Sequence, residues 1–119
     1  MSFLFNSYLF YIVNSPCNIP KAEACYYING SQERLEIKYE KRNDLFITHH
    51  EIGHLKLNKI IEKNLDFWNK FEIVKYLPKG QYDFNVFDKD PKEKVANLYA
   101  CYQMGIIAEL PEEIINKLK

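Results

Sequence analysis

A predicted helix over residues 43–63 constrains this chain most, because it carries all three histidines of the chain between positions 49 and 54. Asn43 or Asp44 provides the N-cap that typically opens such a helix. Two neighbouring stripes run along the segment, one through Ile47, His50, His54, Leu57 and Ile61 and the other through Leu45, Ile52 and Leu55. A helix with this pattern is expected to be buried over a wide arc.

Length and composition predict one folded domain that spans residues 1–119. The chain has a mass of 14.2 kDa, and 47% of its residues are hydrophobic and 27% charged, which suits one compact core and not two. Lys and Arg together number 16, as do Asp and Glu, so the formal net charge is zero. Without an excess of positive charge to neutralise phosphates, direct binding to nucleic acid is not expected.

The cysteines and the N-terminal segment predict a cytoplasmic location. Cys17, Cys25 and Cys101 are odd in number and include no Cys-x-x-Cys pair, so neither a disulfide framework nor a four-cysteine zinc knuckle is expected. The apolar N-terminal run has no positive charge before Lys21 and no small-residue cleavage site after it. It is also shorter than the ~20 apolar residues that cross a membrane. We therefore expect reducing conditions and no association with a membrane.

Hydrophobic periodicity elsewhere predicts an α+β fold. Residues 8–13 favour a strand, although a short helix fits them too, and residues 24–29 and 34–39 flank a Gly30-Ser31 turn that indicates a hairpin. Further elements are expected as a helix over 66–76, a short strand over 82–86, a helix from Asp90-Pro91 to about Gly105, and a last helix after Pro111. These elements predict a small, roughly three-stranded antiparallel sheet packed against the helix at 43–63 and the helix after Pro91.

The segment His50-Glu51-Ile52-Gly53-His54 is an HExxH motif on the predicted helix. Because one helical turn takes 3.6 residues, His50 and His54 project from one face, with Cβ atoms about 6 Å apart. Two such imidazoles reach one Zn²⁺ at roughly 2.0–2.1 Å, and Glu51 lies where it can take a proton from a metal-bound water. The alternative is a pair of core histidines, which would bury two imidazoles and a carboxylate that each need a separate partner. The motif therefore predicts a zinc site with Glu51 as general base.

A catalytic zinc ion also needs a third protein ligand and an open fourth position. Glu93 is the strongest candidate, because it lies in the first turn of the helix predicted after Pro91. In that position it could instead form a capping box with Asp90. His49 points about 100° away from His50 and is not expected to bind the metal. Weaker candidates for the third ligand are Asp83, Asp88, Glu62, Asp66 and Cys101.

Small residues predict that the two helices lie close together. Ala96 and Ala100 share a face with Glu93, and short side chains there would let its helix approach the HExxH helix. Gly53 costs about 1 kcal/mol relative to Ala inside a helix, so a close contact is expected there as well. A strand or a substrate backbone beside the metal would account for Gly53, and so would simple packing against the sheet.

Two segments resemble the ImmA/IrrE family of zinc metallopeptidases. Residues 45–55, Leu-Phe-Ile-Thr-His-His-Glu-Ile-Gly-His-Leu, are similar to the family's signature helix, whose pattern is roughly F-T-x-A-H-E-x-G-H-x-x-L. Residues 93–100, Glu-Lys-Val-Ala-Asn-Leu-Tyr-Ala, are similar to its second motif, E-x-x-A-N-x-F-A. The resemblance covers about residues 8–108. Two positions depart from it: His49 replaces a usual Ala, and residues 102–105 read Tyr-Gln-Met-Gly where L-L-M-P is common.

The resemblance implies a minimal zincin-like domain of the gluzincin kind, with zinc as cofactor. It implies that His50, His54 and Glu93 bind the ion, that Glu51 is the general base, and that Asn97 is a partner of the ligands just outside the coordination sphere. Enzymes of this family cleave a transcriptional repressor that silences a phage, a mobile element or a stress regulon. The expected function is therefore a zinc-dependent endopeptidase that acts on a protein partner such as a helix-turn-helix repressor.

Two other functions are compatible with the sequence. One is a non-catalytic regulatory module, such as an antirepressor or a toxin–antitoxin component, in which zinc is purely structural; Glu51 argues against it, because a structural site has no use for that carboxylate. The other is a structural or nucleic-acid-associated protein whose HExxH is accidental. The aromatic-rich segment 64–87 would shape the pocket, dock the partner or simply fill the core. An extended substrate would add to an exposed sheet edge, for which 82–86 is a candidate.

Overall fold

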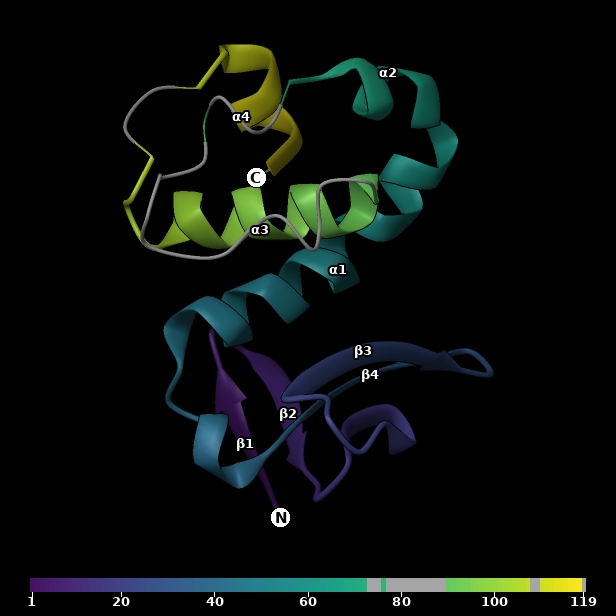
Figure 1. Ribbon diagram of the computed structural model, residues 1–119, viewed down its shortest axis with the longest axis vertical. Helices are drawn as coiled ribbons and strands as arrows, with labels where there is room; N and C mark the ends of the chain where they lie inside the picture. The colour runs from purple at the N-terminus through teal and green to yellow at the C-terminus, as the bar shows by residue number, and fades with distance from the viewer. Residues whose placement is uncertain (73–75, 77–89, 108–109, 119) are drawn as a thin grey trace.

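The computed structural model describes residues 1–72, 76, 90–107 and 110–118. Its elements follow one another as β1 (Ser2–Phe5), β2 (Tyr8–Ile12), the 3₁₀ turn η1 (Pro16–Asn18), β3 (Ala24–Asn29), β4 (Gln32–Ile37), the 3₁₀ turn η2 (Tyr39–Lys41), α1 (Leu45–Lys63), α2 (Leu65–Lys70), α3 (Pro91–Gln103) and α4 (Glu112–Leu118). Figure 1 shows α1 between the sheet and α3, with α4 beyond α3. The predicted α+β class is confirmed.

The sheet differs from the prediction of about three antiparallel strands. It has four described strands in the order β1-β2-β4-β3, of which β2 and β4 are parallel and the other neighbours antiparallel. The sequence analysis missed β1 because Asn6 and Ser7, which look like an interruption, form a tight turn with φ angles of 48° and 69°. The parallel pair arises because the chain crosses after β2 to the far edge, where β3 begins, and the hairpin then returns β4 beside β2.

The predicted hairpin and the predicted strand at 8–13 are confirmed. Gly30 turns the hairpin with a φ of 64°, a conformation that glycine adopts without steric cost. Phe10 of β2 pairs with Leu35 of β4, and these residues and Ile37 are at most 2% exposed. They pack in one core with Ile52 of α1, so the inner face of the sheet supports the helix that carries the histidines.

Both helices that carry the expected site residues begin at predicted caps. The Asp44 carboxylate accepts a hydrogen bond from the Ile47 N–H at 3.0 Å, and the Asp90 carboxylate accepts one from the Lys92 N–H at 2.9 Å. These bonds satisfy N–H groups that have no partner inside their helices. The chain leaves α3 just before Gly105, whose φ is 73°. The predicted bounds of both helices are therefore confirmed to within a few residues.

The aromatic-rich segment 64–87 agrees less closely with the predictions. The helix expected over 66–76 is shorter and ends at Lys70, because Phe71 has an extended backbone. Trp68 is fully buried, and its ring contacts Phe67 and Phe71, so these aromatic residues contribute to the core. The strand expected over 82–86 lies outside the described residues. The helix expected after Pro111 is confirmed as α4.

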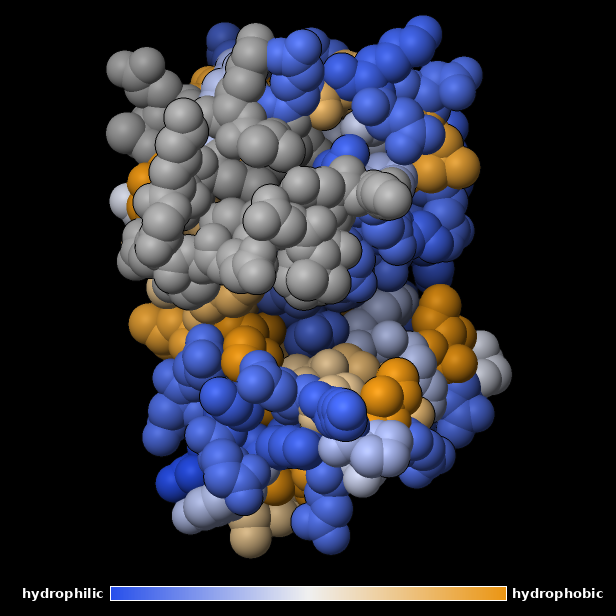
Figure 2. Space-filling view, viewed as in Figure 1, coloured by the Kyte–Doolittle hydropathy of each residue, from blue (hydrophilic) through white to orange (hydrophobic). Residues whose placement is uncertain are grey.

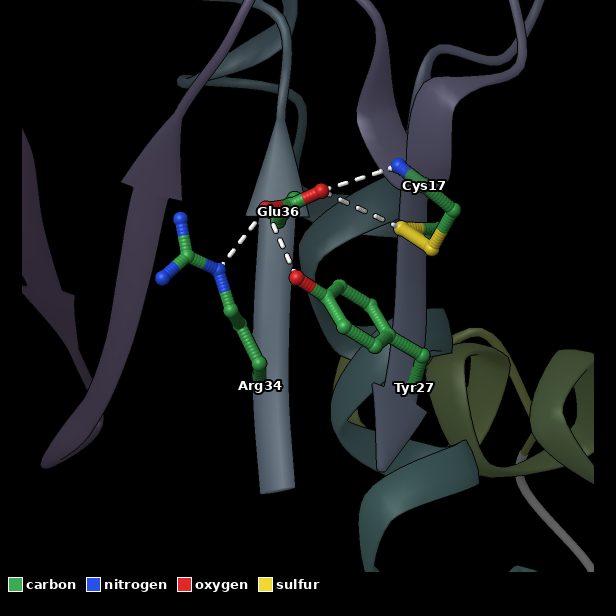
Figure 3. The surroundings of a disulfide bond; sticks show 5 residues. Cys17, Tyr27, Arg34 and Glu36 are labelled. Carbon is green, nitrogen blue, oxygen red and sulfur yellow. Dashed lines mark hydrogen bonds and ion pairs between the residues drawn. A yellow bond between two sulfur atoms is a disulfide. The ribbon is translucent and has the colours of Figure 1, made fainter. Parts of the chain in front are cut away.

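The sequence analysis expected no disulfide framework, but the structure holds one disulfide. Cys17 of η1 and Cys25 of β3 form a disulfide with Cα atoms 6.1 Å apart, whereas Cys101 is a free, buried thiol. Figure 3 shows the bond beside Glu36, on the strand next to β3. The pair was missed because the cysteine count alone does not indicate that the turn after β2 folds back onto β3.

Gly53 marks the closest approach between α1 and α3. A Cβ atom at this position would lie 3.1 Å from Cδ1 of Tyr99 and 3.2 Å from Cα of Ala96. Such distances are tighter than ordinary van der Waals contact. The predicted close approach of the two helices is therefore confirmed, and the partner of Gly53 is α3 rather than a strand, a substrate or the sheet.

The described residues form no large apolar patch on the face shown in Figure 2. Hydrophilic residues cover most of the coloured part of that face, and apolar residues form small separate areas. Exposed apolar side chains include Leu4 of β1 and two residues near opposite ends of α1, Leu45 and Ile60. In the described part of the chain, no helix combines the length and the apolar character that crossing a membrane requires.

Replacing Gly53 with Ala tests this packing. Alanine favours a helix by about 1 kcal/mol over glycine, but an extra methyl group in a tight core typically costs about 1–3 kcal/mol. We expect Gly53→Ala to lower the free energy of unfolding by about 1 kcal/mol, measured by urea denaturation. Lys59→Ala, at an exposed position of the same helix, should change it by less than about 0.5 kcal/mol. A stabilised Gly53→Ala variant would show that helix propensity outweighs the contact.

Candidate metal centre

His50, His54 and Glu93 form a compact cluster between α1 and α3. The Nε2 atom of His50 lies 2.9 Å from Oε2 of Glu93, and Nε2 of His54 lies 3.2 Å from Oε1 of the same carboxylate. The two Nε2 atoms are 3.1 Å apart. These donor atoms converge on one point, so the three residues form a group that can hold a metal ion. Glu93 is therefore drawn to the histidines and not into a capping box.

A hydrogen bond fixes the ring of His54. Its Nδ1 atom lies 2.9 Å from Oδ1 of Asn58, one turn later on α1. Since the amide oxygen accepts, Nδ1–H donates, which leaves the lone pair of Nε2 facing His50 and Glu93. Partners of this kind orient metal-ligating histidines. The sequence analysis missed Asn58, although its position four residues after His54 on the same helix could have indicated it.

Glu51 is buried beside the cluster, with only 8% of its surface exposed, and it lines the same cleft as the three residues. Burial raises the pKa of its carboxyl group, and the charge of Glu93 raises it further, whereas His50 and His54 oppose this shift. A carboxylate with a raised pKa holds a proton more readily than an exposed one. The side chain therefore has the environment of a general base.

Neighbouring groups shift the pKa values of Glu93 and His54. Burial opposes the charge on Glu93, but hydrogen bonds to His50 and His54 outweigh it and hold the pKa of this carboxyl well below its usual range. Burial likewise lowers the pKa of His54, but the hydrogen bond and the negative charge of Glu93 prevail and raise it. A carboxylate that stays ionised suits a metal ligand, because only the deprotonated group can bind.

Asn97 lies one turn after Glu93 on α3 and lines the cleft. Its side chain is fully buried, and neither amide atom has a hydrogen-bond partner within the part of the chain that is described. Burying an unpartnered amide is costly, so the group is available to the cluster or to a bound molecule. Asn97 thus lies at the cleft without a hydrogen bond to a ligand residue, so its expected role as a partner of the ligands stays a prediction.

His49 lies away from the cluster. Its ring packs edge-on against Phe5 at 5.0 Å between centroids and approaches Tyr99 at 6.5 Å. Burial lowers the pKa of its imidazole. The residue is therefore a core histidine, as its position on the helix predicts.

The weaker candidates for a third ligand do not join the cluster. Glu62 forms an ion pair with Lys92, and Asp66 is exposed in the first turn of α2. Cys101 is fully buried, and burial raises the pKa of its thiol to about 11, which disfavours the thiolate. The remaining two, Asp83 and Asp88, lie outside the described residues.

The cluster opens into a cleft of about 670 Å³. One wall is formed by the helices and the other by residues 22–24 and Tyr26, which belong to β3 or directly precede it. β3 is the last strand at this edge of the described sheet, so no described strand pairs with its outer side. A bound chain could therefore lie along β3 and reach Glu51 and the cluster.

Metal-free protein should become less stable as pH rises through the neutral range. The folded-state pKa of His54 is raised, so its protonated form stabilises the fold fully below the unfolded value of about 6.5, and this contribution disappears as pH rises through the folded-state value. We expect the free energy of unfolding, measured by urea denaturation in chelator, to fall as pH rises above about 6.5. Glu93→Gln should flatten this dependence. A rise in wild-type stability over the same range would contradict the coupling.

The chemistry of this cluster must be inferred from its own residues, because comparison of the chain with known proteins offers no precedent. No family model, no curated protein and no solved structure matches the chain.

Proposed function

We propose that the protein is a zinc-dependent endopeptidase with a minimal zincin-like domain. The observation that carries the proposal is the convergence of His50, His54 and Glu93 at a cleft in which Glu51 is buried. Two of these residues come from α1 and Glu93 from α3, 39 positions after His54. Two histidines that merely filled the core would need neither Glu93 from a distant helix nor Glu51 beside them.

The donor set and its spacing suit zinc. Four ligands around Zn²⁺ at roughly 2.0–2.1 Å lie about 3.3 Å from one another in a tetrahedron. In the cluster the two Nε2 atoms are 3.1 Å apart, and the Glu93 carboxylate approaches them with a different oxygen each, Oε2 at 2.9 Å from His50 and Oε1 at 3.2 Å from His54. Imidazole and carboxylate are ligands of catalytic zinc sites, where three protein groups leave a fourth position open. His50, His54 and Glu93 would therefore hold the ion, and the cleft leaves room on its open side.

Glu51 would perform the proton transfers. When bound, zinc supplies a Lewis acid that lowers the pKa of a water molecule and polarises a peptide carbonyl. Glu51 takes the proton of the attacking water and then gives it to the nitrogen of the leaving amine. Its burial supports this role, because a raised pKa lets the carboxyl retain the proton between the two transfers. Asn97, whose amide has no partner among the described residues, is placed to contact the substrate or a ligand.

An extended polypeptide is the substrate class that fits the cleft. The outer edge of β3 forms one wall, and a peptide can add to such an edge by backbone hydrogen bonds. The sequence analysis expected a substrate to add to a sheet edge at 82–86, but these residues lie outside the described ones. The edge of β3 is the one proposed here instead. The partner remains a protein, and the resemblance to the ImmA/IrrE family supports a helix-turn-helix repressor and a cytoplasmic location.

A non-catalytic module with structural zinc is the second candidate. Structural zinc sites are closed by four protein ligands. Among the described residues, this cluster has three metal-binding side chains and opens to a cleft, which favours catalysis. The two candidates differ in what they require of Glu51, because only the peptidase needs its carboxylate.

Replacing Glu51 with Gln separates these functions. The amide keeps the shape of the side chain but cannot accept the proton, so we expect peptide cleavage to fall by about 10²–10⁴-fold or more while zinc binding persists. Cleavage is measured by mass spectrometry on a peptide library from a digested proteome, and zinc by metal analysis. Glu112→Gln, at an exposed site on α4, serves as the matched control and should leave both quantities unchanged.

Two results would contradict the proposal. The first is cleavage by Glu51→Gln at the wild-type rate. The second is a zinc-loaded wild-type chain that cleaves nothing while Glu51→Gln and wild type regulate a partner equally, since that pattern belongs to the non-catalytic module.

A further inference from the structure

A second cluster of metal-binding side chains lies at the disulfide. Cys17 comes from η1, Cys25 from β3 and Glu36 from β4. Their two sulfur atoms and a carboxylate oxygen all lie within 4.8 Å of one another. Figure 3 shows the Glu36 carboxylate directed towards the two cysteines on one side and towards Arg34 and Tyr27 on the other. None of these residues lines the cleft of the first cluster.

Glu36 is unusual because it is a carboxylate with only 6% of its surface exposed. Its Oε1 atom accepts a hydrogen bond from the Cys17 N–H at 2.8 Å. Its Oε2 atom accepts bonds from Nε of Arg34 at 2.7 Å and from the Tyr27 hydroxyl at 3.3 Å. These partners hold the carboxylate in place, since burial of a charge requires them.

In the oxidised protein, one oxygen of this carboxylate faces the disulfide but receives no hydrogen bond from its sulfur atoms. Oε1 lies 3.9 Å from Sγ of Cys25. A sulfur in a disulfide carries no proton, so it cannot donate to this oxygen. The carboxylate therefore directs an acceptor lone pair at the sulfurs that only a thiol proton or a cation can use.

We propose that Cys17, Cys25 and Glu36 bind one zinc ion when the disulfide is reduced. Around tetrahedral zinc two thiolates lie about 3.8 Å apart, and a thiolate and a carboxylate oxygen about 3.5 Å apart. The observed distance of 3.9 Å between Sγ of Cys25 and Oε1 of Glu36 is close to the second of these values. Reduction frees the sulfurs to separate, so the side chains can adopt this spacing with small rotations.

Charge and space both suit such a site. Two thiolates and one carboxylate carry three negative charges, which Zn²⁺ and the guanidinium of Arg34 neutralise. Arg34 is held in position by Glu36 and by the ring of Tyr11, whose centroid lies 3.9 Å from its Cζ atom. Cys17 and Glu36 also border a surface hollow of about 630 Å³, where a water molecule can complete the coordination.

Reduction of the Cys17–Cys25 disulfide requires a reductant, and a dithiol can supply the electrons and protons. The dithiol transfers two electrons and two protons, becomes a disulfide itself, and leaves Cys17 and Cys25 as thiols. Zinc then displaces both thiol protons as two metal–sulfur bonds form. In the reverse change a disulfide is the oxidant: it accepts the two electrons and two protons to become a dithiol, the Cys17–Cys25 bond re-forms, and zinc is released.

This site would keep η1 attached to β3 in either redox state. Cys17 and Asn18 have φ angles of 53° and 58°, which residues other than glycine adopt uncommonly. The turn therefore depends on the contacts that hold it to β3. Residues of β3 also wall the cleft of the first cluster. In a reducing compartment, where disulfides open, bound zinc replaces the covalent link.

Cobalt titration of the full chain tests the proposal. Co²⁺ replaces zinc and gives an intense near-ultraviolet charge-transfer band only when thiolates bind it, so the histidine cluster stays silent. We expect the band in wild-type protein reduced with a phosphine, with one equivalent of cobalt responsible for it, and zinc should abolish it. The oxidised protein should give no band. Cys101→Ser should retain it, whereas Cys25→Ser should lose most of it and Glu36→Gln should weaken cobalt affinity at least 10-fold.

The outcome is independent of the proposed peptidase. His54→Ala removes a ligand of the first cluster and should leave the band unchanged. If reduced wild type gives no band, or if Cys101→Ser removes it while Cys25→Ser does not, the second site is overturned. If Glu36→Gln binds cobalt as tightly as wild type, the carboxylate is not a ligand and the proposal fails in this form.

Discussion

The close contact between α1 and α3 is the constraint on which the candidate site depends. Gly53 leaves room for Ala96 and Tyr99, so the two helices approach until a Cβ atom on α1 would be only 3.1–3.3 Å from its neighbours. This approach brings the first turn of α3 alongside the HExxH turn of α1. The Glu93 carboxylate then lies 2.9 Å from His50 and 3.2 Å from His54. The geometry of the cluster thus follows from a small residue in the middle of a buried helix.

The charges of the cluster favour the binding of a cation. Burial acts against the negative charge of both Glu51 and Glu93, and among the described residues the imidazoles of His50 and His54 offset it. A divalent ion bound by His50, His54 and Glu93 would neutralise the two carboxylates without protonating either imidazole. The same reasoning applies on the other face of the sheet, where Glu36 is buried beside Cys17 and Cys25 and balanced by Arg34.

Local signals made the helical part of this fold predictable. Asp44 and Asp90 cap their helices as their positions indicate, and His50, His54 and Glu93 come together as expected from the HExxH spacing and from the place of Glu93 in the first turn of α3. Features without a clear signal in the sequence were not predictable. The turn at Asn6 and Ser7 reads as polar interruption until its left-handed backbone is known. Likewise, the contact between Cys17 and Cys25 depends on how the turn after β2 returns to β3.

X-ray absorption at the zinc edge tests the central claim most directly. The oxidised protein, loaded with one equivalent of zinc, keeps Cys17 and Cys25 unavailable as thiolates. The account predicts four nitrogen and oxygen neighbours at roughly 2.0–2.2 Å, with the multiple scattering of two imidazoles. A sulfur neighbour at about 2.3 Å, or a spectrum without imidazole scattering, would contradict it.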